Sequence, residues 1–534
     1  MSDSLARAPL QGEPAPGWTL ERLTPPSRLF GANGLRTGRD GRIYVAQVAG
    51  SQVSAVDPDT GAVETISPMG GPIVGPDDLA FDDEGVLYAT EITRGRVGAR
   101  LPDGRYRVVC DEMPCANPIT FHRGHLYAGE CRPGGRILEL DRAGGPPRVI
   151  LEDVPMPNAF EVGPDGLLYF PVMAANQIWR VDPRGGRPEV VASELGVPDS
   201  VKFDADGYIV STQVASGEVL RIDPRTGRKE VLARLQPGLD NCTFVGRRLF
   251  VSSITGAIVE ILPRGEVRSV VPGGFQWPMG LAVDDAGTLL VADGGFVYEL
   301  VPGRRPELVG MLFTPGFPGF TRGVTAGSSP GEWIVTTANG QVAAWRPAAR
   351  EHRVLAEGFD RLMEVDRTAQ GHLVFAEYGR GRVLALRGGA VETLAEDLAE
   401  PVGVAVADDG ACYVTESARG RILRLDGGPA RVVADELGQP EGLDWHGGRL
   451  YVVDVARREL LRIDPASGSV ESLARQLPVG APPGAQRVQL GAVGVLSGPM
   501  TCFTGLAVGG DGTVYLSADA EGSVLAVRPQ PSPP

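Results

Sequence analysis

Residues 199–238 hold the repeating unit that determines the fold: DSVKFDADGYIVSTQ at 199–213, GEVLRIDP at 217–224 and KEVLARL at 229–235. Apolar and polar residues alternate with a period of two in each segment, which is typical of β-strands with one buried face. Two strands flank a turn at Asp206-Gly207, a glycine turn precedes the third strand, and a fourth strand follows. We therefore predict a unit of four antiparallel strands joined by tight turns.

The same unit recurs along the chain about every 40 residues. Its copies begin near residues 33, 77, 117, 158, 199, 240, 279, 322, 361, 402, 441 and 504. Four-stranded units of this length, without helical periodicity, favour propeller blades over a solenoid or a sandwich, and one propeller usually holds about four to eight blades. We predict an all-β chain with two tandem six-bladed β-propellers at 18–265 and 266–534, after a disordered or extended arm at 1–17.

The ends of the repeats indicate how the rings close. The last unit stops after its third strand at SVLAVRP (523–529), and strand-like segments at 18–23 and 266–271 precede the first and the seventh unit. We expect each segment to be the outer strand of the last blade of its own propeller. Residues 18–23 would complete the blade at 240–263, and residues 266–271 the blade at 504–528.

Composition limits the classes of function. The 534 residues include 73 Gly and 45 Pro, yet 43% are apolar, as expected for many short strands and turns around a core. A net charge of -15 argues against a nucleic-acid or anionic-membrane partner. No export signal or long apolar run is present, so we expect a soluble, cytoplasmic protein. Its six scattered cysteines are expected to be free thiols. Composition leaves the oligomeric state open.

The first residue of each inner strand is expected to point toward the propeller axis, so equivalent positions form a ring. In the first propeller all six positions hold Asn or Asp, called here the ring residues: Asn33, Asp77, Asn117, Asn158, Asp199 and Asp240. Asn and Asp also suit turns that precede strands, which is the structural alternative. The second propeller serves as a control, because its positions read Met279, Arg322, Arg361, Val402, Glu441 and Thr504. Blade geometry alone therefore does not demand Asn or Asp there.

Three carboxylates and three amides that meet at one point would repel one another without a positive charge among them. Oxygen ligands select hard divalent cations, and a wide, flexible cage favours calcium, with magnesium and manganese as alternatives. We predict a cation site at the ring and a small-molecule substrate. Glu91 and Glu130, at the ends of second strands on the same face, are candidates for proton transfer beside it, or hydrogen-bonded strand ends.

One stretch interrupts the repeat. Leu477 to Met500, rich in Gly, Pro and Val, separates the unit at Glu441 from the unit at Thr504. It should lie on the face where an outer strand passes to the next inner strand. A surface loop without a role and a lid or brace are both open interpretations.

The ring segments ANGL (32–35), ANPI (116–119), PNAF (157–160) and PDSV (198–201) resemble the senescence-marker-protein/gluconolactonase family and the related paraoxonases and diisopropyl fluorophosphatase. The resemblance implies a six-bladed propeller with a catalytic calcium or other divalent ion, held by Glu, Asn, Asn and Asp from blades one, three, four and five. By blade, the last three correspond to Asn117, Asn158 and Asp199, whereas Asn33 stands in place of the Glu. LYATEITRGRVG (87–98) and CYVTESARGRILRLD (412–426) also look like the streptogramin lyase propellers.

This resemblance and the oxygen-rich ring together predict a metal-dependent hydrolase of a lactone or related ester. Asp199 would be a metal ligand and possible base, and Glu91 or Glu130 would carry a proton. The altered blade-one ligand keeps a second hypothesis open, a metal-dependent lyase, isomerase or cyclase acting on a specialised metabolite. A third is a propeller that binds without catalysis.

Overall fold

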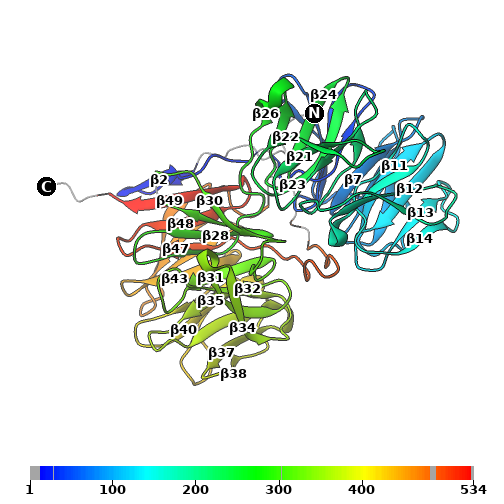
Figure 1. Cartoon of the computed structure of the whole chain (residues 1–534). Coiled ribbons are helices and arrows are strands. Elements are labelled where there is room, and N and C mark those ends of the chain that lie inside the picture. The colour runs from blue at the N-terminus through cyan, green and yellow to red at the C-terminus, as the bar shows by residue number, and fades with distance from the viewer. Residues whose placement is uncertain (1–11, 28, 302, 482–486, 488, 531–534) are drawn as a thin grey trace. The chain divides into compact units, whose positions relative to one another are not determined.

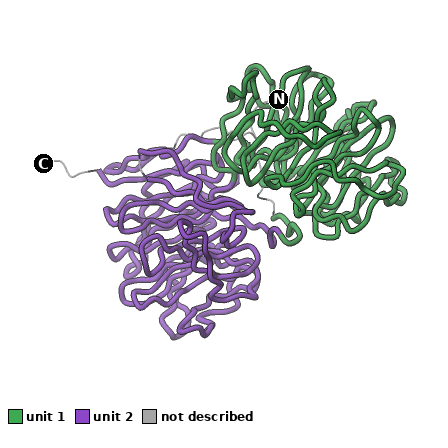
Figure 2. Tube along the Cα trace, in the orientation of Figure 1, with its two compact units in different colours: residues 1–6, 27–276, 483–495 green, residues 7–26, 277–482, 496–534 purple. Residues whose placement is uncertain are grey.

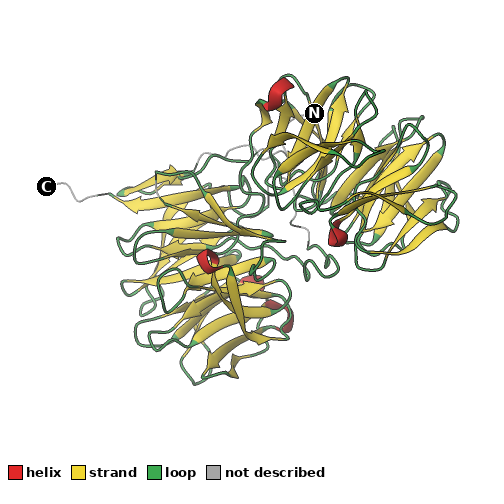
Figure 3. Ribbon diagram, viewed as in Figure 1, coloured by secondary structure: helices red, strands yellow, loops and turns green. Residues whose placement is uncertain are grey.

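The computed structural model describes residues 12–27, 29–301, 303–481, 487 and 489–530. Strands dominate this part of the chain, and its only helices are five short 3-10 turns (Figure 3). The turns are η1 (Met173–Ala175), η2 (Pro263–Gly265), η3 (Pro347–Ala349), η4 (Tyr378–Arg380) and η5 (Ser417–Arg419). The all-β prediction is confirmed.

The chain divides into two compact units (Figure 2). Of the described residues, unit 1 holds 27, 29–276, 487 and 489–495, and unit 2 holds 12–26, 277–301, 303–481 and 496–530. The described residues form twelve antiparallel sheets, numbered here in chain order, of which six belong to each unit. These sheets match the twelve predicted repeats and are consistent with propeller blades.

Unit 1 contains sheets 1 to 6, each made of four strands that follow one another in the chain. Their strands are β3 (Leu35–Thr37), β4 (Ile43–Gln47), β5 (Gln52–Val56) and β6 (Val63–Ser67); β7 (Pro76–Phe81), β8 (Leu87–Glu91), β9 (Arg96–Arg100) and β10 (Tyr106–Cys110); β11 (Ala116–His122), β12 (His125–Glu130), β13 (Gly135–Leu140) and β14 (Arg148–Val154); β15 (Glu161–Val162), β16 (Leu168–Val172), β17 (Gln177–Val181) and β18 (Glu189–Ala192); β19 (Lys202–Phe203), β20 (Ile209–Thr212), β21 (Glu218–Ile222) and β22 (Lys229–Arg234); β23 (Leu239–Val245), β24 (Arg248–Ser253), β25 (Ile258–Ile261) and β26 (Val267–Val271).

Unit 2 contains sheets 7 to 12, and the last two include strands from the N-terminal region. Their strands are β27 (Leu281–Val283), β28 (Leu289–Asp293), β29 (Phe296–Leu300) and β30 (Glu307–Met311); β31 (Thr321–Ala326), β32 (Trp333–Thr337), β33 (Gln341–Arg346) and β34 (Glu351–Glu357); β35 (Leu362–Arg367), β36 (Leu373–Glu377), β37 (Arg382–Arg387) and β38 (Ala390–Ala395); β39 (Pro401–Val406), β40 (Cys412–Glu416), β41 (Arg421–Leu425) and β42 (Arg431–Ala434); β43 (Pro440–His446), β44 (Arg449–Asp454), β45 (Glu459–Ile463) and β46 (Val470–Arg475), with β1 (Glu13–Pro14) beside β46; β47 (Leu506–Val508), β48 (Val514–Ala518) and β49 (Ser523–Pro529), with β2 (Trp18–Arg22) beside β49.

The turn that joins the first two strands of a sheet follows from its sequence. In sheet 5 the Asp204 carboxylate accepts backbone N–H groups of Asp206 and Tyr208, both at 2.9 Å. Gly207 adopts a φ of 80°, a left-handed conformation that costs a glycine little. The Asp-x-Asp-Gly pattern therefore closes the hairpin by local hydrogen bonds.

Hydroxyl groups join neighbouring sheets in both units. The Thr90 hydroxyl of sheet 2 donates to the Asn117 carbonyl of sheet 3 at 2.7 Å, and the Ser252 hydroxyl of sheet 6 donates to the Asn33 carbonyl at 2.8 Å. The second of these bonds links sheet 6 to the segment that leads into the first strand of sheet 1. In unit 2 the Thr415 hydroxyl of sheet 10 donates to the Glu441 carbonyl of sheet 11 at 2.9 Å. A Cβ on Gly505 would lie 2.2 Å from the Met279 carbonyl oxygen, so sheet 12 lies against the start of sheet 7. The sheets of each unit therefore close on themselves.

The predicted closure strands are wrong. The segment 266–271 does not leave its own unit, because β26 pairs with β25 through Ile258↔Val271 and Ile261↔Val267. The segment 18–23 does not complete sheet 6, because β2 pairs with β49 from Trp18↔Pro529 to Arg22↔Leu525; Figure 1 shows β2 in blue beside β49 in red. Sheets 1 to 11 each contain four strands that follow one another in the chain, so among the described residues the vacant outer position is the one beside β49.

The N-terminal arm is extended where it is described. Glu13 and Pro14 pair with Arg475 and Ala474 as an edge strand of sheet 11. Residues 1–11, which belong to the same predicted arm, lie outside the described residues.

The core lies between adjacent sheets rather than in one central layer. Leu35, Ile43 and Val45 of sheet 1 pack with Phe250 and Ile258 of sheet 6 in one buried cluster. Each sheet is therefore apolar on both faces. Among the described residues, none of the helices has the length and apolar character needed to cross a bilayer. All six cysteines carry free thiols.

Candidate functional site

The backbone places the ring residues at equivalent positions. In sheets 2 to 6 the residue that precedes the ring residue pairs with the end of the second strand of the same sheet. The pairs are Pro76↔Glu91, Ala116↔Glu130, Pro157↔Val172, Pro198↔Gln213 and Leu239↔Ser253, of which Gln213 directly follows its strand. In sheet 1 the Asn33 N–H donates to the Ala46 carbonyl at 2.9 Å, as the Asp199 N–H does to the Thr212 carbonyl at 3.0 Å. The predicted equivalence therefore holds in the backbone.

Two pairs of ring residues are in direct contact. The Asn33 Nδ2 donates to Asp240 Oδ2 at 2.9 Å, and the Asn158 Nδ2 donates to Asp199 Oδ2 at 3.0 Å. The side chains of all four are buried, with 4% to 8% of each residue exposed. Sheets 1 and 6, and sheets 4 and 5, thus bring their ring residues together.

The three ring carboxylates lack a compensating positive charge. Burial, followed by the repulsion of neighbouring acids, raises the pKa of Asp77 and of Asp199 well above the usual range. Burial likewise raises the pKa of Asp240 to about 7, although the hydrogen bond from Asn33 opposes this. Burial without a neighbouring cation therefore favours the protonated form of all three carboxyl groups.

The amide oxygens of the three ring asparagines differ in their partners. Asn33 Oδ1 accepts the Val48 N–H at 3.1 Å, and Asn158 Oδ1 accepts the Ala159 N–H at 2.7 Å. Asn117 Oδ1 is buried and has no hydrogen-bond partner among the described residues. A buried acceptor without a donor is costly, so this oxygen fits a cation ligand.

His, Cys, Asp and Glu side chains do not by themselves form a metal site in the described residues. Within the described residues, no group of three or more His, Cys, Asp or Glu side chains has an arrangement that could hold a metal ion. A cation at the ring would depend on amide oxygen as well as carboxylate. The donor set remains entirely oxygen, which suits calcium.

Residues that precede the ring residues by two positions adopt a left-handed backbone. Cys115, Met156 and Val197 have φ values of 57°, 60° and 62°, and glycines occupy the other positions, with φ of 58° at Gly75. The Val197 carbonyl accepts the Val214 N–H at 2.9 Å, which holds this conformation. Positive φ is unfavourable for a β-branched residue, but Arg361 and Glu400, two positions before Met363 and Val402 in unit 2, adopt φ values of 51° and 55°, so this conformation belongs to the repeat.

Sulfur atoms adjoin the ring, and the sequence interpretation missed them. The Asn158 Nδ2 lies 3.0 Å from the Met173 Sδ, which is 3.9 Å from the Cys131 Sγ. Cys131 and Met173 directly follow the second strands of sheets 3 and 4, where Glu130 and Val172 end them. Burial, followed by the charges of Asp77 and Asp199, raises the pKa of the Cys131 thiol well above its usual range. This side of the ring is therefore lined by neutral, weakly polar groups.

Glu91 and Glu130 are fully buried and held by arginines. Glu91 Oε2 accepts Arg96 Nη2 at 2.8 Å and the Val74 N–H at 2.9 Å, and Tyr106 donates to Oε1. Glu130 accepts Arg132 Nη2 at 2.8 Å and also bonds Arg136.

The same arrangement recurs in unit 2. Glu377 pairs with Arg380 and Arg382, and the Asp360 N–H donates to it at 2.8 Å. The Ala399 N–H donates to Glu416 in the same way, also at 2.8 Å. These recurring contacts favour a structural role for Glu91 and Glu130, as clamps at the end of the second strand.

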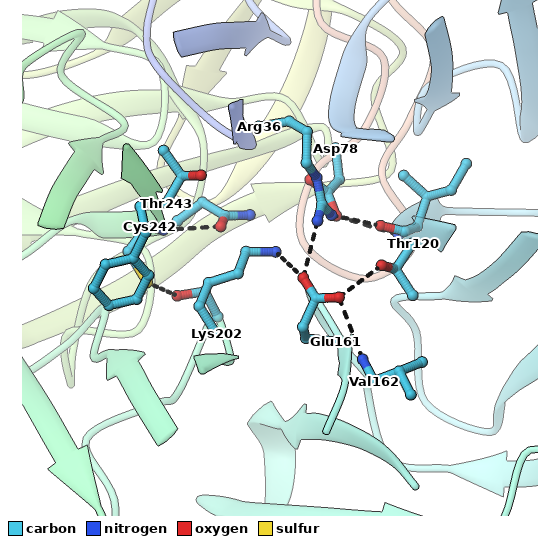
Figure 4. Close-up of polar contacts among 12 residues, drawn as sticks. Arg36, Asp78, Thr120, Glu161, Val162, Lys202, Cys242 and Thr243 are labelled. Carbon is cyan, nitrogen blue, oxygen red and sulfur yellow. Dashed lines mark hydrogen bonds and ion pairs between the residues drawn. The ribbon is translucent and has the colours of Figure 1, made fainter. Parts of the chain in front are cut away.

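A second layer of charge lies three residues beyond the ring on the inner strands (Figure 4). Glu161 accepts Arg36 Nη1 at 3.0 Å and the Thr120 hydroxyl at 3.1 Å, and it pairs with Lys202 Nζ at 3.4 Å. Burial acts to raise the pKa of Glu161, but the charges of Lys202 and Arg36 outweigh it and lower that pKa. We call these residues, with Asp78, the buried network.

The buried network has equal numbers of positive and negative side chains. Asp78 Oδ1 accepts the Leu79 N–H at 2.8 Å and Oδ2 accepts the Ile119 N–H at 3.2 Å. Burial raises the pKa of Asp78, and Arg36 and Lys202 oppose that rise. The positive charges of Arg36 and Lys202 thus balance the negative charges of Glu161 and Asp78. The network therefore has no excess positive charge that could neutralise the ring carboxylates. The repeat offset of three residues, which gives Arg36, Thr120, Glu161 and Lys202, could have revealed this layer.

The positions of unit 2 that are equivalent to the ring residues do not all hold Asn or Asp, as predicted, but one of the predicted positions is wrong. Leu362 pairs with Glu377 as Pro401 pairs with Glu416, so the residue equivalent to Val402 is Met363 rather than Arg361. The corrected positions are Met279, Arg322, Met363, Val402, Glu441 and Thr504. Arg322 is fully buried and donates through Nη1 to the Leu362 carbonyl at 3.1 Å.

Comparison with known proteins matches the oxygen-ring half of the chain. Residues 32–255 match the family model described as SMP-30/Gluconolactonase/LRE-like region. This segment holds all six ring residues and is less than half of the 534 residues. No curated protein sequence matches the chain.

Solved structures that match about half of the chain include two lyases. A streptogramin B lyase is 18% identical, over 52% of this chain and 94% of its own, with a TM-score of 0.39. Virginiamycin B lyase from Staphylococcus aureus is 16% identical, over 53% of this chain and 96% of its own, with a TM-score of 0.39. A protein described provisionally as a gluconolactonase is 18% identical, over 50% of this chain and 99% of its own, with a TM-score of 0.38.

Proposed function

We propose that each unit is a six-bladed β-propeller and that unit 1 is a divalent-cation-dependent enzyme, a hydrolase of a lactone or related ester. The observation that carries this proposal is the raised pKa of the three ring carboxylates, Asp77, Asp199 and Asp240, in the same ring of positions as the unpartnered oxygen of Asn117. Perturbed carboxyl groups beside an unsatisfied acceptor are typical of functional sites. The family match over residues 32–255, which include all six ring residues, supports it.

Calcium is the cation that this donor set suits best, with magnesium and manganese as alternatives. Asn117, Asp77 and Asp199 would hold it, because each has a carboxylate or amide oxygen free of a hydrogen bond from a described residue. Asn158 would serve once its oxygen leaves the Ala159 N–H, to which it now bonds at 2.7 Å. Asn33 instead fixes Asp240, which would remain beside the ion as a compensating charge.

A divalent cation at the ring would supply Lewis-acid polarisation of the substrate carbonyl. Asp199 would ligate the cation through Oδ1, and its Oδ2, which accepts Asn158 Nδ2 at 3.0 Å, keeps a second lone pair to accept a proton from the attacking water. Met173 and Cys131 would exclude bulk water from that side. Glu91 and Glu130 have no part in proton transfer in this scheme, because each carboxylate already pairs with an arginine.

Two contacts of Asn33 favour the alternative of a lyase, isomerase or cyclase. Asn33 uses its oxygen on the Val48 N–H and its nitrogen on Asp240, so the first sheet supplies no free oxygen to the ring. Product mass separates the alternatives, because hydrolysis adds one water and the other reactions add none. Tight calcium binding without turnover over a broad panel would indicate a binding protein.

The test is an ester and lactone panel assayed with the protein as purified, after chelation, and after calcium is restored. The proposal predicts activity that chelation abolishes, calcium restores and Asp199→Ala removes. Equal rates in all samples would refute it. Asp285→Asn, an exposed change in unit 2, is the matched control and should retain full activity.

A further inference from the structure

Part of the insertion between β46 and β47 belongs to unit 1, and its residues 482–486 and 488 lie outside the described residues. By their contacts, residues 489–495 belong with sheets 1 to 6, although the strands on either side belong to unit 2. Leu490 and Val493 are 2% and 7% exposed, whereas Val495 is 67% exposed. Residues 489–495, called here the cover segment, are therefore anchored by two buried apolar side chains.

Two glycines allow the cover segment to approach sheets 2 and 3 closely. A Cβ on Gly491 would lie 2.4 Å from the Thr93 carbonyl oxygen. A Cβ on Gly494 would lie 3.0 Å from Cys115 Sγ and 3.9 Å from Arg132 Cβ. Gly494 also has a φ of 51°, which a side chain would strain. Larger residues at either position would force the segment away.

The residues beneath the cover segment border the ring. Cys115 precedes Asn117 by two residues, and Thr93 and Arg132 each follow the end of a second strand by two residues. Two unpartnered buried oxygens lie in the same region, Asn117 Oδ1 and Thr93 Oγ1. A Cβ on Gly75, two residues before Asp77, would lie 2.5 Å from Thr93 Oγ1. The segment thus covers the Asp77 and Asn117 side of the ring.

We propose that the cover segment is a wall of the ring site, which shields the Asp77 and Asn117 side so that ligands enter over the other sheets. The ligand assignment rests on the proposed function, but the shielding does not. The wall is supplied by the chain that follows sheet 11, so the site of unit 1 is complete only in the full chain. The two glycines set its distance from the ring.

The experiment displaces the wall with Gly491→Val and measures shielding and ligand entry separately. Shielding is the labelling rate of Cys115 by a maleimide, followed by peptide mass spectrometry. Entry is the association rate of terbium(III), a luminescent substitute for calcium. Gly491→Val should label Cys115 at least tenfold faster and raise the terbium association rate. Ala492→Val, an exposed neighbour, is the control and should change neither.

Unchanged Cys115 labelling in Gly491→Val would overturn the wall. If that variant fails to fold, Leu490→Ala with Val493→Ala loosens the same anchor and must give the same faster labelling. Absence of terbium binding in every protein, with Cys115 labelling still faster in Gly491→Val, would refute the cation site and leave the wall supported.

Discussion

Asn33 and Asp240 join the first and sixth sheets of unit 1 through one hydrogen bond of 2.9 Å, from Asn33 Nδ2 to Asp240 Oδ2. The bond closes the ring and favours the ionised form of a carboxylate whose burial raises its pKa to about 7. One contact thereby couples the closure of the unit to the charge of the candidate site.

Removal of this donor should weaken cation binding. Asn33→Ala leaves Asp240 without the bond that opposes its raised pKa, so more of the carboxyl is protonated at neutral pH. A hydrogen bond to a charged group contributes about 1.5–3 kcal/mol, so we expect calcium affinity to fall roughly tenfold. Isothermal titration calorimetry measures the change.

The control for Asn33→Ala lies between the same two sheets. Thr37 bonds the Thr243 hydroxyl at 2.9 Å, away from the ring. Thr37→Val should reduce thermal stability and leave calcium affinity unchanged. Equal losses of affinity in both variants would assign the effect to ring closure rather than to Asp240.

Calcium binding and stability should depend on pH in opposite directions. The pKa of Asp240 rises from 3.8 to about 7 on folding, so the cation-free folded state binds more protons than the unfolded chain between these values. Its stability therefore falls as pH rises through this range. Calcium requires ionised carboxylates, so it should raise Tm more at pH 8 than at pH 5. Differential scanning calorimetry that gave the larger shift at pH 5 would contradict this.

Glu91 should matter for stability rather than for chemistry. Loss of a fully buried carboxylate leaves Arg96 and the Val74 N–H without their acceptor, which should cost about 3–5 kcal/mol. Glu377→Ala removes the equivalent clamp in unit 2 and should cost a similar amount. Chemical denaturation measures both. Native stability in Glu91→Ala, combined with lost activity, would restore the catalytic interpretation.

Unit 2 should carry its own pH dependence. Asp366, Asp444 and Glu364 line a cavity of about 210 Å³ in this unit. Burial, followed by the charge of Asp366, raises the pKa of Asp444 to about 7. Because the folded pKa exceeds the ordinary value of 3.8, the stability of unit 2 should fall as pH rises between the two. Asp444→Asn should flatten that fall in urea titrations, whereas the exposed Asp285→Asn should not. An unchanged slope in Asp444→Asn would contradict the assignment.

The repeats were predictable because each sheet carries its own turn chemistry and strand alternation, as in residues 199–238. The ring followed because equivalent positions of a repeat must lie side by side once the sheets close. Closure itself was not predictable from strand patterns, since 18–23 and 266–271 look alike as isolated strands. Only the pairing of β26 with β25 leaves β49 to accept β2.

Other features of the site could not be predicted from the sequence, because they depend on which side chains are in contact. Glu91 at a strand end looks the same whether it carries a proton or holds Arg96, and the contact decides. The buried network required a comparison of residues three positions beyond the ring, where Glu161 and Lys202 meet. The lining by Met173 and Cys131 has no sequence pattern of its own.

Calcium stoichiometry tests the central claim most directly. Equilibrium dialysis with metal analysis at pH 8 should find about one calcium per chain in the natural protein. Asp199→Asn with Asp240→Asn should find none and should still fold, because both amides retain the shape of the carboxyl groups they replace. No bound calcium in the natural protein, or undiminished binding in the folded double variant, would contradict a cation at the ring.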